Sequence, residues 1–209
     1  MNGVYLVTPD WDDTAALLAR TEQALQAGVA MLQYRHKGAD PALRLQQAAQ
    51  LLALCRRYAV PLIINDHIDV CMELGADGVH VGGCDASVAA ARAQLGDQAI
   101  IGASCYGERA LALRAAGEGA SYVAYGGFYP SRVKQYAVTT AADIVDWSCA
   151  TVTLPAVVIG GMTPANAAPL VARGAAMVAA ISSVYGAPSA AAAVRQFRAL
   201  FDGAGGHDA

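Results

Sequence analysis

Only two of the fourteen cationic residues in the chain are lysines, and both lie in segments that could bind an anion. Lys37 follows Gln33 and Arg35 in the segment QYRHK, and Lys134 lies in GGFYPSRVK. Side chains two residues apart on a strand point to the same face, so Gln33, Arg35 and Lys37 would share one face. Clustered cations in a partly desolvated cavity repel each other, and a polyanionic ligand would remove that penalty. A solvated strand end with flexible cations is the alternative interpretation.

Two carboxylates stand at the ends of successive strand-like runs. Asp66 follows the run Leu62–Ile64, and Asp85 follows the run Gly78–Val81. Carboxylates at the ends of adjacent strands can share Mg²⁺, which typically takes one or two carboxylates together with waters and phosphate oxygens. Either aspartate could instead cap the helix that follows it.

Hydroxyl groups and glycines follow the later strand-like runs. Ser104 offers a neutral donor, whereas Cys105 beside it has no evident base partner that would make it a nucleophile. The segments VVIGGMTPAN and ISSVYG could bring backbone N–H groups to a phosphate, because glycine lets the backbone approach a ligand closely. Cations and carboxylates on one side, with this phosphate cup on the other, predict a site for two phosphorylated small molecules.

The elements that must position these residues are short strand-like runs that alternate with helix-like segments, the pattern of a minimal (β/α)8 TIM barrel. The strand-like runs are Val4–Val7, Met31–Arg35, Leu62–Ile64, Gly78–Val81, Ile100–Ser104, Tyr122–Tyr125, Ala156–Ile159 and Met177–Ile181. The helix-like segments include Thr14–Gln26, Pro41–Tyr58, Ala86–Leu95, Glu108–Ala116, Pro164–Arg173 and Ala190–Phe201. A doubly wound sheet is the alternative, although the first strand lacks the glycine fingerprint that such sheets usually carry. In a barrel the chemistry belongs at the C-terminal ends of the strands, where the residues above lie.

The composition indicates one globular α/β domain. The 209 residues are 56% hydrophobic and 15% charged, so we expect residues 1–202 to form the barrel and residues 203–209 a flexible tail. The net charge of −3 provides no basic field for nucleic acid, and no apolar run is long enough to span a membrane. Five cysteines without a C-x-x-C pair, and an N-terminus without a signal peptide, predict reduced thiols and a cytoplasmic protein.

Six segments, taken in order and spacing, resemble the thiamine-phosphate synthase family over nearly the whole chain. They are QYRHK, LIINDHIDVCMELGADGVHVGGCD, IIGASCY, GGFYPSRVK, VVIGGMTPAN and GAAMVAAISSVYG. The resemblance implies a single-domain (β/α)8 barrel and a transferase that joins a hydroxymethylpyrimidine diphosphate to a thiazole phosphate with release of pyrophosphate. It also implies a dissociative displacement, in which the thiazole nitrogen captures a pyrimidine carbocation.

The resemblance assigns residues of this chain to each ligand. The pyrimidine diphosphate would be held by Gln33, Arg35, Lys37, Asn65, Ser104 and Lys134. Mg²⁺ would be bound by Asp66 and Asp85. The thiazole phosphate would be held by Ser131, Gly161, Ile181 and Ser182. Of these, Lys134, Arg35 and Lys37 would be catalytic, because they would stabilise the charge on the departing pyrophosphate.

The chain departs from the family's pattern at three places. His36 stands where the family often has an acidic residue, Gly83 stands where it usually has glutamine, and Val133 replaces a threonine of its P-T-x-T-K segment. A thiazole tautomerase-like isomerase and a non-catalytic barrel that binds thiamine precursors are therefore the alternatives. The retained diphosphate and metal residues favour the synthase. The sequence leaves open whether the chain forms a homo-oligomer and whether the thiazole is carboxylated.

Overall fold

The computed structural model is a closed barrel of eight parallel strands, and it describes residues 1–82, 87–130 and 140–202. The strands are β1 (Gly3–Val7), β2 (Met31–Tyr34), β3 (Leu62–Asn65), β4 (Gly78–Val81), β5 (Ile100–Tyr106), β6 (Tyr122–Gly126), β7 (Ala156–Ile159) and β8 (Met177–Ala180). Each strand pairs with the next one along the chain, and β8 pairs with β1 to close the ring. The predicted (β/α)8 barrel is thereby confirmed, and the doubly wound sheet is excluded.

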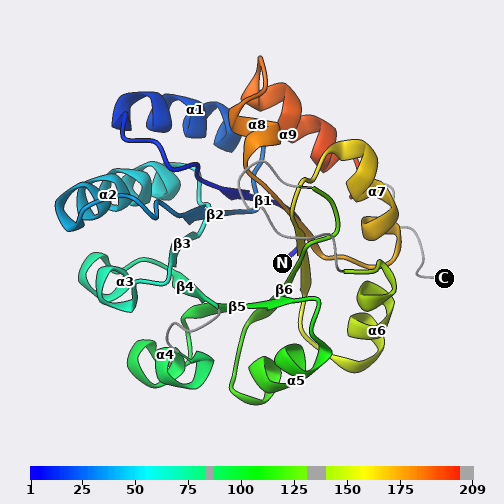
Figure 1. The fold of residues 1–209 in the computed structure, drawn as a ribbon. Helices are drawn as coiled ribbons and strands as arrows, with labels where there is room; N and C mark the ends of the chain where they lie inside the picture. Colours follow the sequence, from blue (N-terminus) through cyan, green and yellow to red (C-terminus); the bar gives the residue numbers. More distant parts are fainter. Residues whose placement is uncertain (83–86, 131–139, 203–209) are drawn as a thin grey trace.

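Helices lie outside the strands and surround the barrel (Figure 1). They are α1 (Thr14–Gln26), α2 (Pro41–Arg57), α3 (Ile68–Leu74), α4 (Val88–Leu95), α5 (Arg109–Gly117), α6 (Asp143–Thr151), α7 (Pro164–Ala172), α8 (Ser182–Tyr185) and α9 (Ala190–Arg198). Asp13 caps α1 by accepting a hydrogen bond from the Ala16 N–H at 3.0 Å. Thr163 and Asn166 form a capping box at the start of α7. These caps fix the points at which the β1 and β7 loops enter their helices.

Alternation along the strands divides the core into two layers. The outer layer packs residues such as Leu32, Tyr34 and Val123 among the apolar residues of the helices. The inner layer fills the barrel with Tyr5, Val7, Met31, Ile63, Tyr122, Ala124, Val157, Met177 and Ala179. The barrel interior is therefore packed with side chains, as expected for this fold.

Several element boundaries differ from the sequence prediction. Helices α3 and α8 were not among the segments named, because runs of seven and four residues are too short to show a helical period. Helix α6 was also not named. Strand β2 ends at Tyr34, so Arg35 and Lys37 follow the strand instead of belonging to it. Helix α4 begins at Val88 with Ser87 as its N-cap, and the predicted start at Ala86 lies outside the described residues.

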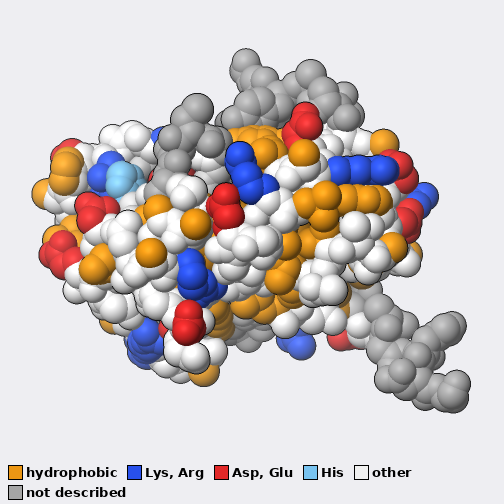
Figure 2. Space-filling view, turned by 90° about the horizontal axis from the view of Figure 1, so that it is seen from below, with side chains coloured by type: hydrophobic (Ala, Val, Ile, Leu, Met, Phe, Trp, Pro, Cys, Tyr) orange, Lys and Arg blue, Asp and Glu red, His pale blue; other side chains and the backbone are white. Residues whose placement is uncertain are grey.

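Charges of both signs are distributed over the surface. On the face shown in Figure 2, Lys and Arg side chains are interspersed with Asp, Glu and apolar side chains. Surface ion pairs among the described residues include Arg56 with Asp77 at 2.7 Å and Arg109 with Asp143 at 3.3 Å. Within the described ranges, no helix has both the length and the apolar character needed to cross a bilayer. The predicted tail, residues 203–209, lies outside those ranges.

Candidate active site

A cavity lies where the strands end, and it gathers residues that are far apart in the sequence. The predicted site residues that line it are Gln33, Arg35, Lys37, Asn65, Asp66, Ser104 and Ile181. They come from the ends of β2, β3, β5 and β8, the edge of a barrel at which ligands bind. The structure thus places these side chains around one space, while their individual roles stay predictions.

Arg35 is anchored by two residues of the β1 loop. The backbone N–H of Arg35 donates to Thr8 Oγ1 at 2.8 Å, and the Thr8 hydroxyl donates to the Arg35 carbonyl at 2.8 Å. The Arg35 Nη1 donates to Asp10 Oδ1 at 3.0 Å and to Oδ2 at 3.2 Å. None of the described residues accepts a hydrogen bond from Arg35 Nε or Nη2. Since the guanidinium is planar, these two nitrogens can form a two-pronged contact with a phosphate in the cavity.

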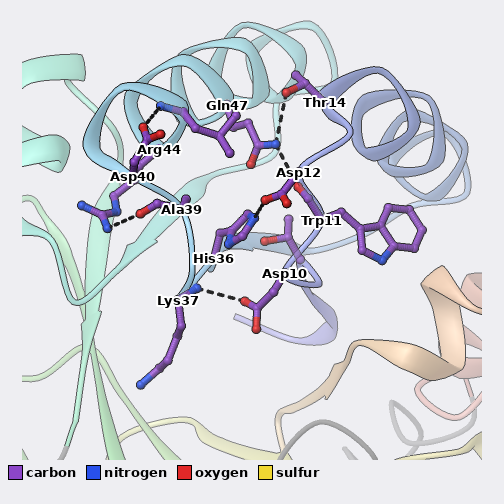
Figure 3. A network of polar contacts seen from close by, with 12 residues as sticks. Asp10, Trp11, Asp12, Thr14, His36, Lys37, Ala39, Asp40, Arg44 and Gln47 are labelled. Atoms are coloured by element: carbon purple, nitrogen blue, oxygen red, sulfur yellow. Dashed lines mark hydrogen bonds and ion pairs between the residues drawn. The ribbon is translucent and has the colours of Figure 1, made fainter.

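Asp10 also holds the backbone from which Lys37 extends. Its Oδ1 accepts a hydrogen bond from the Lys37 N–H at 3.0 Å. Figure 3 shows the Lys37 side chain extending away from the rest of the labelled network. Among the described residues, the Lys37 ammonium has no hydrogen-bond or ion-pair partner. A compact, exposed cation therefore borders the cavity close to the anchored Arg35.

His36 points away from these two cations. Its Nε2 lies 3.0 Å from Asp12 Oδ1, and its Nδ1 is buried without a hydrogen-bond partner in the described part of the chain. Gln47 of α2 reinforces the same loop by donating to the Trp11 carbonyl at 2.9 Å (Figure 3). The histidine that replaces the family's usual acidic residue thus ties the β1 loop to the end of β2.

Asp66 has a backbone conformation that is unusual for a residue with a side chain. Its φ is 64°, in the left-handed region that L-residues adopt at some cost. The Asn65 amide donates to Asp66 Oδ2 at 2.5 Å, and the Asp66 N–H donates to the His80 carbonyl at 2.9 Å. His67, and not Asp66, occupies the N-cap of α3, which argues against the alternative capping role. The carboxylate instead lines the cavity.

The donor set at Asp66 suits a hard cation, because carboxylate and phosphate oxygens are the ligands that Mg²⁺ prefers. Within the described residues, no group of three or more His, Cys, Asp or Glu side chains could hold a metal. A magnesium ion at Asp66 would therefore need further ligands from phosphate, water or Asp85. Asp85 lies outside the described residues, so the structure leaves the pairing of the two carboxylates a prediction.

Below the cations, polar side chains form a hydrogen-bonded chain inside the barrel. Gln33 Nε2 lies 2.6 Å from the Tyr5 hydroxyl, which lies 2.6 Å from the Tyr122 hydroxyl. His80 connects Tyr122 to Ser104, with 3.0 Å from Nδ1 to the Tyr122 oxygen and 2.8 Å from Nε2 to Ser104 Oγ. Burial raises the pKa of both tyrosines above the ordinary value, so both hydroxyls stay protonated. His80 is therefore held by hydrogen bonds at both ring nitrogens.

The loops after β7 and β8 carry three of the residues predicted to hold the thiazole phosphate, Gly161, Ile181 and Ser182. Gly161 has a φ of 62°, and a Cβ built there would lie 2.3 Å from the Pro130 carbonyl oxygen. The Asn166 side chain donates to the Gly161 carbonyl at 3.0 Å and so holds this turn. Ile181 lines the cavity, whereas Gly161 and Ser182 are not among the described residues that do so. Ser182 begins α8.

Some predicted residues lie where the structure describes nothing. They are Asp85, Ser131 and Lys134, together with the altered positions Arg132 and Val133. The thiol of Cys105 is described, and it is buried among the apolar residues outside the barrel. Burial raises its pKa to about 12, so it stays protonated and is a poor nucleophile.

Sequence reasoning missed three residues that organise the cavity: Asp10, Tyr5 and Tyr122. Asp10 follows β1, and the rule that chemistry lies at strand ends could have found it. The tyrosines alternate toward the barrel interior, but the contact between them joins residues 117 positions apart. No pattern within the sequence signals such a contact.

Comparison with known proteins gives consistent matches over nearly the whole chain. The sequence model of a family described as thiamine monophosphate synthase matches residues 4–184. A thiamine-phosphate synthase of Janthinobacterium sp. (strain Marseille) is 63% identical over 202 residues, which cover 96% of this chain and 97% of that protein. One of Xanthomonas campestris pv. campestris (strain 8004) is 51% identical over 201 residues, or 95% of each chain. The solved structure of a thiamine phosphate pyrophosphorylase from Pyrococcus furiosus has a TM-score of 0.83 at 27% identity, covering 96% of this chain and 95% of that one.

Proposed function

The chain belongs to the thiamine monophosphate synthase family and is a transferase, and on that premise we propose its two substrates and the roles of its residues. The first substrate is 4-amino-2-methyl-5-(diphosphooxymethyl)pyrimidine. The second is 4-methyl-5-(2-phosphoethyl)thiazole or its carboxylated form. The products are thiamine phosphate and pyrophosphate. One observation carries the proposal: a single cavity is lined by Arg35, Lys37, Asp66 and the amides and hydroxyl beneath them.

The depths at which the site residues lie in the barrel predict the orientation of the bound pyrimidine diphosphate. The chain runs from Gln33 through Arg35 to Lys37 toward the open end of the barrel. Gln33 and Ser104 are hydrogen-bonded to side chains inside the barrel, Tyr5 and His80, whereas Lys37 is exposed. The uncharged ring therefore enters first, and the diphosphate stays at the mouth among the cations.

Catalysis follows from where charge develops. The bond between the pyrimidine methylene and the diphosphate oxygen breaks, and the electron pair leaves with pyrophosphate. Arg35 receives this charge with two fixed N–H groups, and Lys37 follows an oxygen as a flexible point charge. Lys134 supplies a second ammonium in this proposal. The thiazole nitrogen then donates its electron pair to the methylene cation, so no general base is needed.

Asp66 and Asp85 would hold Mg²⁺ at the same edge. When bound, the ion supplies positive charge to the phosphate oxygens. The Asn65 amide would help to orient the Asp66 carboxylate, because it donates to Oδ2. The fixed turn at Asp66 keeps that carboxylate at the cavity.

The thiazole phosphate would bind on the β7 and β8 side. Backbone groups of Gly161 and Ile181, the start of α8 at Ser182, and the Ser131 hydroxyl are its proposed partners. The glycine at 161 is required there because any side chain would meet the Pro130 carbonyl. This geometry supports a fixed cup whose donors are mainly backbone N–H groups.

Incubation of the purified protein with both precursors and Mg²⁺ tests the proposal. Equal amounts of thiamine phosphate and pyrophosphate are expected. An isomerase would change the thiazole without releasing pyrophosphate, and a binding protein would change neither compound. Either of those results contradicts the synthase assignment.

A further inference from the structure

Five side chains from five strands form one continuous hydrogen-bonded chain across the barrel. It starts at Gln33, passes through Tyr5, Tyr122 and His80, and ends at Ser104, with every heavy-atom distance between 2.6 and 3.0 Å. Both of its ends line the cavity. Its middle is largely buried, because Tyr5, Tyr122 and His80 are 1%, 0% and 8% exposed. The hydrogen-bonded chain therefore connects two walls of the site, and Tyr5 and His80 line the same cavity between them.

The protons in this chain must all point in one direction. Gln33 Nε2 can only donate, so the Tyr5 oxygen accepts, and the single proton of Tyr5 goes to the Tyr122 oxygen. The Tyr122 proton then goes to His80 Nδ1, which leaves the imidazole proton on Nε2. Nε2–H donates to Ser104 Oγ. The proton of Ser104 is left for the cavity.

We propose that Tyr5, Tyr122 and His80 are positioning residues that select the pyrimidine ring by fixing Gln33 as an acceptor and Ser104 as a donor toward the cavity. One of the two N–H groups of the Gln33 amide donates to Tyr5 and so fixes the orientation of the amide, and no described residue donates to its Oε1. A ring that faces Oε1 and Ser104 then presents an N–H donor to Gln33 and a lone pair to Ser104. This inference rests on the proposed function and names how its first substrate is recognised.

An aminopyrimidine has this pattern. Its exocyclic amino group donates to the Gln33 carbonyl, and an unprotonated ring nitrogen accepts from the Ser104 hydroxyl. An analogue with oxygen in place of the amino group would direct a carbonyl at the Gln33 carbonyl. Two acceptors facing each other in a site with little water are strongly unfavourable, so the site would reject that analogue.

The surrounding packing keeps the tyrosines in this arrangement. A Cβ built at Gly102 would lie 2.0 Å from Tyr122 Cζ, so the glycine provides the space for this ring. Tyr5 meets Tyr122 edge to face with 5.7 Å between centroids, and His80 stacks on Tyr122 with 5.7 Å between centroids. Each ring therefore limits the rotation of the next, and the hydroxyl groups cannot easily exchange partners.

The tautomer of His80 gives a test that does not depend on turnover. Two-bond ¹H–¹⁵N correlation spectra of uniformly ¹⁵N-labelled protein report which ring nitrogen carries the proton, and the His80→Gln spectrum identifies the signals. A neutral ring protonated on Nε2 is expected at pH 7.5. Protonation on Nδ1 instead, or on both nitrogens, would show that the hydrogen bonds do not run in the direction from Gln33 to Ser104, and it would overturn the inference.

Kinetics of Tyr5→Phe and Tyr122→Phe test the selection itself. Each variant should reduce the preference for the amino substrate over its oxo analogue, measured as a ratio of kcat/KM, roughly ten-fold. The KM for thiazole phosphate should stay within about two-fold. The matched control is Tyr125→Phe, since Tyr125 is equally buried on the same strand but donates to Ser148 outside the barrel.

A purely structural role would lower the activity toward both pyrimidines equally, and an unchanged ratio in both variants would overturn the inference. If a variant does not fold, the wild-type tautomer measurement still decides. Failure of the proposed function and failure of this inference give different results. A protein that makes no thiamine phosphate but shows the Nε2–H tautomer contradicts only the proposed function.

Discussion

Asp10→Ala removes the carboxylate that fixes the Arg35 side chain and the Lys37 backbone, although no sequence pattern had assigned it a role. In the structure, Asp10 Oδ1 accepts from Arg35 Nη1 at 3.0 Å and from the Lys37 N–H at 3.0 Å. Without it, the Arg35 side chain and the Lys37 backbone would have to be ordered when the diphosphate binds. Ordering costs about 0.5–1.5 kcal/mol for a flexible side chain and about 1–2 kcal/mol for the backbone of one residue, so the two together cost about 2 kcal/mol.

An opposing effect reduces this loss. Asp10 carries a negative charge near the proposed diphosphate position, and its removal favours an anion. The Asp10 side chain is 40% exposed, so solvent screens this charge and limits the gain to less than about 1 kcal/mol. The positioning effect is the larger, and the net change of about 1.4 kcal/mol corresponds to a roughly ten-fold lower kcat/KM for the pyrimidine diphosphate.

Asp10→Asn separates the two effects. Both of the 3.0 Å bonds end on Oδ1, so an asparagine keeps them and loses only the 3.2 Å bond to Oδ2 together with the charge. We expect its kcat/KM to stay within about two-fold of wild type, because the lost 3.2 Å bond and the lost negative charge have opposite effects. Asp12→Asn is the matched control, because Asp12 contacts His36 from the same loop, and its kcat/KM should stay within about two-fold of wild type.

Steady-state kinetics at saturating thiazole phosphate, with pyrophosphate as the readout, measure these differences. A higher kcat/KM in both Asp10 variants would mean that charge repulsion outweighs positioning. That result would refute the reasoning about Arg35 and Lys37.

Four further predictions follow from the site and the core. Asp66→Asn, or excess EDTA with the wild type, should abolish pyrophosphate release, and turnover that survives EDTA would argue against a metal at Asp66 and Asp85. Gly161→Ala should raise the KM for thiazole phosphate at least ten-fold, because its Cβ would lie 2.3 Å from the Pro130 oxygen; an unchanged KM would place that phosphate elsewhere. Lys134→Ala should slow the single-turnover chemical step by about two orders of magnitude while thiazole phosphate still binds, and an unchanged rate would refute its catalytic role. Burial raises the pKa of Cys55 and Cys105 from 9.0 to about 12, so these thiols lose their protons at lower pH in the unfolded state than in the folded state. The free energy of unfolding should therefore fall as the pH rises from 9 toward 12. Urea titrations at pH 8 and 10 that show equal stability would contradict this.

The barrel could be predicted because its signals are local. Alternating strand-like and helix-like segments, together with caps such as Asp13 and Thr163, are readable within a few residues. The shared face of Gln33, Arg35 and Lys37 also follows from the two-residue period of a strand. The structure accordingly places all three on one cavity and turns His36 toward Asp12.

The contacts that anchor these residues could not be predicted in the same way. Asp10 meets Arg35 across 25 positions, and Tyr5 meets Tyr122 across 117. Such pairs depend on how the closed ring brings separate strands together, and a single sequence carries no record of that register. The left-handed backbone at Asp66 was equally invisible, because only glycine signals such a conformation reliably.

The central claim is that one cavity holds the departing pyrophosphate between a divalent ion and the two cations that follow β2, Arg35 and Lys37. A crystal structure of the protein with pyrophosphate and Mg²⁺ tests it most directly. We expect pyrophosphate oxygens within hydrogen-bond distance of Arg35 Nη2 and of the Lys37 and Lys134 ammonium groups, and a metal bound by Asp66 and Asp85. Pyrophosphate bound away from Arg35 and Lys37, or a metal that contacts neither aspartate, would contradict the account.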